Sequence, residues 1–252
     1  MIGVGIVTYD REKKFSEAYD AIDYSLIDKT FHVKDGGKPP YSDSERYENL
    51  WELDENKGVG FCKNLIIDNL LNWDCEHIFI LEDDCRVTDN NVWKYCIDFA
   101  KHTGLLHFNW NNYRSEDTRH TLVKFPKCDA LMSYNVDANF SYFNREFLKN
   151  IRFDENYINA WEHVDVEYQG IIQGFLPAFR MFVSPAYLNH YLRTDDGGES
   201  TIVGRPLHHE RIIEGFHYWG KKWGKNISEI DTLPMEEFKV NMKEITKKYA
   251  QR

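Results

Sequence analysis

The stretch 77-HIFILEDDCRV-87 contains an apolar run typical of a buried strand, and this run ends in three consecutive acids, Glu82, Asp83 and Asp84. Neighbouring carboxylates at the end of a core strand repel one another and lose hydration, so a cation is expected beside them. A bound metal ion is the leading interpretation. Acids also cap strands and helices, so the residues around the triplet have to support that interpretation.

Strand and helix patterns alternate on the N-terminal side of this stretch. The predicted strands cover residues 2–7, 31–33, 50–53 and 77–81, and the predicted helices cover 15–26 and 59–71. Repeated βα units of this length predict an α/β fold with a mostly parallel sheet and helices on its faces. After residue 101 the pattern is less regular, with strands expected at 128–134 and 139–143 and helices at 145–150, 162–173, 206–223 and 234–251.

Composition limits the classes of function. The chain has 31 basic and 41 acidic residues among 252, and this formal charge of −10 argues against a protein that binds nucleic acid by bulk attraction. No apolar run is long enough to span a membrane and no basic segment precedes residues 2–7, which predicts a cytoplasmic protein, in the host cytoplasm if it is viral. The five cysteines show no CxxC pair, so buried, reduced thiols are expected.

Polar loops follow the other predicted strands as well. In open α/β sheets, ligands bind beyond the carboxyl ends of the strands, and that edge would carry 8-TYDR-11, 35-DGG-37 and 56-NKGVGFCKN-64 beside the triplet. Together these motifs resemble the nucleotide-sugar half of a GT-A glycosyltransferase of the family-2-like group. The segments 139–174 and 217-HYWGKKWG-224 extend the resemblance over nearly the whole chain. Lys63 stands where that family usually has Arg, and Asp10 where Asn is common.

The resemblance implies a GT-A fold in a single domain over residues 1–252. Residues 1–100 would bind the nucleotide sugar, 101–205 would carry the acceptor and catalytic half, and 206–252 would form C-terminal helices. The implied activity is a metal-dependent, inverting transfer of a sugar from a nucleoside diphosphate to a hydroxyl acceptor, such as a glycan or a lipid-linked saccharide. The donor-binding residues would be Thr8, Tyr9, Arg11, Asp35, Asn56, Gly58, Lys63 and Asp83.

The charge of the donor gives the metal a physical role. An acidic protein can hold a diphosphate by placing Mn²⁺ or Mg²⁺ between its carboxylates and the phosphate oxygens. Family likeness assigns the metal to Asp84, with Glu82 and a late histidine, His190, as further ligands. His190 precedes a glycine-containing loop at 195–200 that could act as a lid, although a surface histidine and a plain connection are equally expected. His208 and His209 are weaker candidates, because neighbouring helical residues point in different directions.

An inverting transfer also needs a base that removes the acceptor's hydroxyl proton. The family's usual position for it corresponds to 161-WEHVD-165, where Glu162 and Asp165 are spaced to share a helix face and His163 replaces the commonest second acid. Glu162 and Asp165 rank close together, with His163 third. Acids in a first helical turn can also simply stabilise the helix dipole. Without an essential carboxylate, a retaining mechanism or a silent protein becomes the better interpretation.

Aromatic residues near these acids are candidates for acceptor contacts. Trp161 could stack on a sugar, and Trp110 and Tyr113 lie in the irregular middle segment. Such residues more often belong to the core.

Other classes of function stay open. A phage-type glycosyltransferase acting on a DNA base is disfavoured by the acidity, and a nucleotidyltransferase lacks its Gly-rich signature in 3-GVGIVTYDR-11. A catalytically silent sugar- or nucleotide-binding module is the third alternative. Rossmann oxidoreductases and P-loop proteins fit less well, because no GxGxxG follows a strand and no GxxxxGK(S/T) occurs in the sequence.

Overall fold

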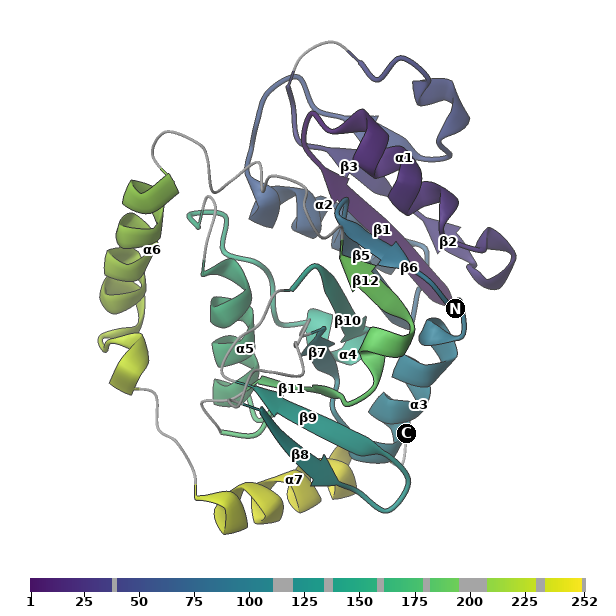
Figure 1. Cartoon of the computed structure of the whole chain (residues 1–252). Helices are drawn as coiled ribbons and strands as arrows, with labels where there is room; N and C mark the ends of the chain where they lie inside the picture. Colours follow the sequence, from purple (N-terminus) through teal and green to yellow (C-terminus); the bar gives the residue numbers. More distant parts are fainter. Residues whose placement is uncertain are drawn as a thin grey trace.

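The computed structural model describes residues 1–37, 40–110, 120–133, 138–157, 161–178, 182–194, 208–229 and 234–250. Its main sheet has the strand order β4-β3-β1-β5-β10-β7, with β2 beside β1 (Figure 1). The strands are β1 (Ile2–Thr8), β2 (Lys29–Thr30), β3 (His32–Lys34), β4 (Leu50–Glu52), β5 (His77–Glu82), β7 (His107–Asn109) and β10 (Phe140–Asn144). Strands β1 to β5 pair in parallel, and β10 is antiparallel to β5 and β7. The predicted α/β fold with a mostly parallel sheet is confirmed.

Helices cover both faces of this sheet. On one face lie α1 (Glu12–Asp20) and α3 (Val92–Thr103), where Trp93 packs edge-on against Phe79 of β5 at 5.0 Å between ring centres. On the other face lie α2 (Val59–Asn72), α4 (Arg145–Leu148) and α5 (Glu162–Ile172). Gly5 of β1 leaves room there for Ile66 of α2, because a Cβ at this glycine would collide with the isoleucine side chain.

Two smaller sheets and two further helices complete the described structure. Strands β8 (His120–Lys124) and β9 (Asp129–Ser133) form a hairpin that β11 (Phe182–Pro185) extends, and β6 (Cys85–Val87) pairs with β12 (Leu192–Thr194). Helix α6 (His208–Trp223) packs near α5, and α7 (Met235–Tyr249) packs on α3. No helix in the described part is both long and apolar enough to cross a bilayer.

The predicted first helix is too long. Residues 15–26 were expected to be helical, but α1 ends at Asp20 and a separate 3₁₀ turn covers Tyr24–Leu26. The side chain of Asp23 accepts a hydrogen bond from the Ser25 amide at 3.0 Å, and such a local bond competes with helix continuation. Sequence patterns also missed α3, β6 and β8.

Candidate functional site

The pleat of β5 separates the three acids. Successive side chains of an extended chain point to opposite faces. Glu82, the last residue of β5, points toward α2 and α5, whereas Asp83, the next residue, points toward Arg11 just before α1. Asp84 lies in the turn between β5 and β6. The three carboxylates therefore have three different environments instead of forming one cluster.

Glu82 is neutralised from within the protein. Lys63 of α2 is fully buried, and its Nζ lies 2.7 Å from a carboxylate oxygen of Glu82 and 3.8 Å from one of Glu162. Burial alone would raise the pKa of Glu82, but Lys63 and then His163 outweigh it and lower that pKa to about 2. Glu82 is thus an anion with a permanent internal counter-ion.

Asp83 is also neutralised from within the protein, by Arg11. Arg11 donates hydrogen bonds to both carboxylate oxygens, from Nε to Oδ2 at 2.9 Å and from Nη2 to Oδ1. The Thr8 hydroxyl donates to Oδ2 at 2.7 Å and lies 2.7 Å from the Tyr41 hydroxyl. Burial raises the pKa of Asp83 to about 6, against the opposing effects of Arg11 and Thr8. The structure therefore brings together three of the residues expected to bind the donor, Thr8, Arg11 and Asp83.

Asp84 differs from its two neighbours, because it has no ion pair within the described part of the chain. One of its oxygens accepts a hydrogen bond from the Asn139 side chain at 3.1 Å. Burial, followed by the charge of Glu82, raises the pKa of Asp84. Of the three acids, Asp84 is the one with no ion pair to a described residue, and the more distant charges of Arg11 and Lys14 only partly offset the effects of burial and Glu82.

His190 does not join these acids. In the antiparallel pair β6–β12, Thr194 lies opposite Cys85 and Leu192 opposite Val87, so Asp84 and His190 lie at opposite ends of the pair. At about 3.3 Å per residue, this places them roughly 10 Å or more apart. His190 is exposed and its ring stacks on Tyr187. The ligand set of Glu82, Asp84 and His190 is therefore not assembled, and the expected lid at 195–200 lies outside the described residues.

A different trio has metal-like spacing. Ligand atoms of Glu82, Glu162 and His163 lie within 4.8 Å of one another, but the Nζ of Lys63 sits among them, 2.5 Å from His163 Nε2. The ammonium donates, so Nε2 accepts and the proton of the neutral ring lies on Nδ1, a buried atom without a partner in the described residues. Burial and then Lys63 lower the pKa of His163. The lysine occupies the place that a metal ion would take.

The two candidate bases have different neighbours, although both belong to α5. Glu162 faces Lys63 and His163. Asp165 is wholly buried and faces α6, where Lys222 Nζ lies 2.9 Å and Trp223 Nε1 2.8 Å from its oxygens. It also accepts from the side chains of Gln169 and Tyr157. The two acids of the helix therefore do not converge on one point.

The aromatic candidates are engaged in packing. Trp110 is 1% exposed and donates from Nε1 to Asn189 at 2.7 Å, so its expected role as a stacking platform is corrected to a core role. Trp161 is partly exposed at the start of α5, where its Nε1 donates to the Ile212 carbonyl of α6 at 2.9 Å. Tyr113 lies outside the described residues.

The remaining donor-binding candidates shape the loop before α2. Asp35 accepts hydrogen bonds from the backbone amides of Lys57 at 2.7 Å and Gly58 at 3.1 Å, which ties the end of β3 to the start of α2. Gly58 has φ of +93°, a conformation that favours glycine. Asn56 is exposed and Tyr9 is half-buried at the same edge. Asp35 thus orders this loop.

A buried polar network below the edge was not predicted. Glu167 of α5 accepts from Asn109 at 2.9 Å and lies 3.4 Å from His107 Nε2. Burial raises the pKa of Glu167 from 4.5 to about 8 and lowers that of His107 to about 3, so both side chains are neutral at pH 7. The sequence could have indicated this network, because Glu167 is an acid four residues after His163 and so lies on the same side of α5, which faces the sheet.

Glu167→Gln should flatten the pH dependence of stability. Between pH 4.5 and about 8 the folded protein retains a proton on Glu167 that the unfolded chain has lost, so this contribution to the free energy of unfolding is full at low pH and disappears as the pH rises. Between about pH 5 and pH 8 the wild type should lose on the order of 3–4 kcal/mol more than the variant. Urea unfolding of both proteins at the two pH values tests this, and parallel losses would show that the carboxyl group ionises normally.

Comparisons with known proteins found similarity in structure and none in sequence. No known protein family matches the sequence, nor does any curated protein. Staphylococcus aureus TarS, solved with UDP-GlcNAc, is 16% identical over 61% of this chain and 48% of its own, with a TM-score of 0.44. The mannosyltransferase PcManGT from Pyrobaculum calidifontis, solved with GDP-Man and Mn²⁺, is 13% identical over 67% of this chain and 52% of its own, with a TM-score of 0.46.

A third structure comes from a different class of enzyme. The nucleoside-diphosphate-sugar pyrophosphorylase from Vibrio cholerae RC9 is 15% identical over 58% of this chain and 75% of its own, with a TM-score of 0.33. This chain spans about half the length of the TarS and PcManGT chains.

Proposed function

We propose that this protein is a metal-dependent glycosyltransferase that transfers a sugar from a nucleoside diphosphate to a hydroxyl acceptor. The loop motifs supply the class of reaction, and one observation carries the role of the metal. Lys63 neutralises Glu82 and Arg11 neutralises Asp83, whereas Asp84 is left without an internal cation in the described structure. Two of the three adjacent acids therefore have a cation supplied by the protein, and we expect the third to bind a cation from solution.

The residues around Asp84 suit a hard divalent cation. Mg²⁺ and similar ions are commonly held by one or two carboxylates, with phosphate oxygens and water completing the shell. Asp84 offers one such carboxylate at the sheet edge, and the Asn139 amide orients it. A divalent ion held there would supply a positive charge that stabilises the departing diphosphate.

Arg11 and Lys63 hold the neighbouring elements in place at the carboxyl end of β5. Because Arg11 binds Asp83 through two nitrogens, the loop after β1 is held against the end of β5. Lys63 likewise joins α2 to β5 and to α5. We infer that Thr8, Arg11 and the loop ordered by Asp35 line the nucleoside pocket, with their positions set before the donor arrives.

We assign the base to Glu162. Asp165 already accepts from four side chains, so it has little capacity to take up a proton without breaking them. His163 commits its acceptor nitrogen to Lys63. Glu162 lies at the sheet edge next to Glu82, and its nearest described cations and rings are 3.5 Å or more away. Its carboxylate can therefore receive the hydroxyl proton as the acceptor oxygen attacks the sugar from the face opposite the diphosphate.

Thermal unfolding with UDP, GDP, CDP and dTDP, each with and without Mn²⁺, tests the proposed function. One nucleotide should raise the Tm by about 5 °C at a hundredfold excess over its Kd, and only with the metal, because binding to the folded state stabilises it. Mn²⁺ alone is the control. An absence of any shift would contradict a nucleotide-sugar enzyme, and a shift without metal would contradict the role of Asp84.

A further inference from the structure

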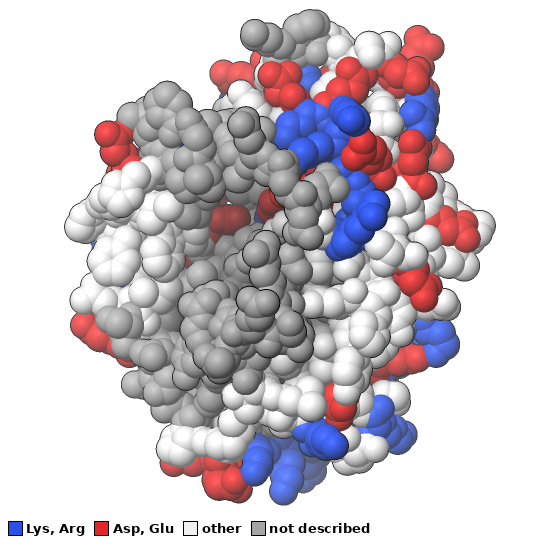
Figure 2. All heavy atoms as spheres, viewed as in Figure 1, with Lys and Arg blue, Asp and Glu red and all other residues white. Residues whose placement is uncertain are grey.

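A groove of about 720 Å³ lies away from the candidate site, between the end of α3, the β8–β9 hairpin and α7. Among the described residues that line it there is no acid, although the chain as a whole has ten more acidic than basic residues. Its six lysines are Lys101, Lys124, Lys127, Lys239, Lys243 and Lys247. Figure 2 shows Lys and Arg atoms gathered over α7 at the lower end of that view. The groove is a basic surface on an acidic protein.

Three of these lysines form a row along α7. Lys239, Lys243 and Lys247 are four residues apart, so they lie on one exposed side of the helix, while Phe238 and Met242 pack inward. Lys239 pairs with Glu236 at 2.7 Å, a surface contact of little energy. The other five lysines of the groove make no ion pair with a described residue. Their charge is therefore available to a partner.

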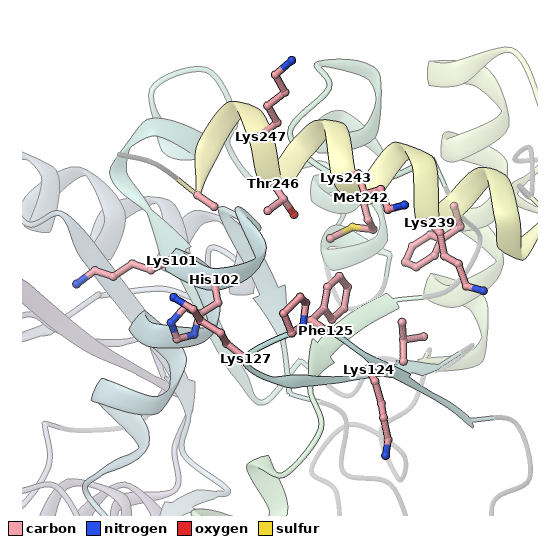
Figure 3. Close-up of a pocket in the computed structure, with 14 residues that line it drawn as sticks. Lys101, His102, Lys124, Phe125, Lys127, Lys239, Met242, Lys243, Thr246 and Lys247 are labelled. Atoms are coloured by element: carbon pink, nitrogen blue, oxygen red, sulfur yellow. The ribbon is translucent and has the colours of Figure 1, made fainter.

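The lysines diverge instead of converging. In Figure 3, Lys101, Lys124 and Lys247 extend away from the groove in different directions. A single small anion could not contact them together, whereas a broad surface carrying many spaced negative charges could. Val240, which is 57% exposed, lies one helical turn from Lys243 and also from Glu236 and Glu244, and it adds an apolar group at the border of the lysine row.

We propose that this face, the basic groove and the α7 lysine row, docks on an anionic phospholipid surface. Lysines close to such a surface are attracted to its negative potential, and an apolar side chain among them can reach the boundary between headgroups and acyl chains. The exposed valine favours a lipid surface over nucleic acid, which offers spaced phosphates but no apolar layer at its surface. The enzyme edge at Asp84 is formed by other elements, so docking would leave it open.

Sedimentation of the full chain with vesicles tests the proposal. We expect binding to phosphatidylcholine vesicles that contain about 30% phosphatidylserine, little binding to pure phosphatidylcholine, and release by about 0.5 M salt. A triple variant, Lys124→Gln with Lys243→Gln and Lys247→Gln, should bind about a hundredfold more weakly, at roughly fivefold per lysine.

A matched variant separates this surface from general charge. Lys29→Gln, Lys94→Gln and Lys149→Gln together make the same change in net charge at exposed positions outside the groove. This control should bind vesicles nearly as well as the wild type, and both variants should keep the wild-type Tm. Equal weakening by the two variants, no binding by the wild type, or binding to single- or double-stranded nucleic acid in preference to vesicles would each overturn the proposal.

Discussion

Asp84→Asn is expected to reduce sugar transfer by about a thousandfold and to remove the metal dependence of nucleotide binding. A divalent ion at a phosphoryl group contributes several kcal/mol of charge stabilisation, and each 1.36 kcal/mol corresponds to about tenfold in rate. The amide keeps an oxygen that can accept from Asn139, so the turn should be preserved. The measurements are the initial rate of transfer and the Mn²⁺-dependent shift in Tm.

The same substitution should leave the fold intact or make it slightly more stable. Burial and the charge of Glu82 raise the pKa of Asp84, which means that its anionic form is disfavoured in the folded protein. Asp43→Asn, at an exposed position in another loop, is a matched control and should retain activity. Full activity of Asp84→Asn with unchanged metal dependence would place the cation elsewhere.

The sequence predicted the edge of the sheet better than the contacts made there. Each strand-ending motif is local, so the placement of Thr8, Asp35 and Glu82 at the carboxyl ends of parallel strands followed from the order of elements alone. The alternation of side chains along β5 was also readable in principle, and it is what separates Glu82 from Asp83. The predicted strand ended at Leu81, whereas β5 extends to Glu82, so the prediction treated all three acids as one loop motif.

Long-range partners could not be predicted in the same way. The pairing of Asp165 with Lys222 joins residues 57 positions apart, and nothing in either segment specifies the other. The misplacement of His190 has a similar cause, because the register of β12 against β6 sets its position. Trp110 was predicted to contact the acceptor because it lies in an irregular part of the sequence. Its burial instead depends on the packing of β7 against the 3₁₀ turn that contains Asn189.

Glu162→Gln should mainly reduce the rate of transfer, whereas Asp165→Asn should mainly reduce stability. If Glu162 is the base, its amide variant should lose about a hundredfold to ten-thousandfold in the rate of transfer, because a positioned base contributes this much. Its stability should change little, since Lys63 keeps its closer partner, Glu82, at 2.7 Å. Nucleotide binding with Mn²⁺ should also persist, because the change affects proton removal and not the donor.

Asp165→Asn should mainly weaken the fold. Its carboxylate is fully buried and joins α5 to α6 through Lys222 and Trp223. After the substitution Lys222 still pairs with Asp154 at 2.7 Å. The free energy of unfolding should therefore fall by about 2 kcal/mol, which is less than the 3–5 kcal/mol expected when a buried charge loses its only partner. The Tm should then fall by about 4–8 °C, with transfer reduced far less than in Glu162→Gln when both are assayed well below the Tm.

The pH profile decides between the two acids independently of stability. The base must be deprotonated to act, so the acid limb of the rate profile reports its ionisation. Glu162→Gln should remove that limb from the residual activity, whereas Asp165→Asn should retain it with the same apparent pKa. If Asp165→Asn removed the limb while its Tm stayed at the wild-type value, the roles would be reversed: the contacts to α6 would then have to open during catalysis, and Glu162 would serve to hold Lys63 beside Glu82.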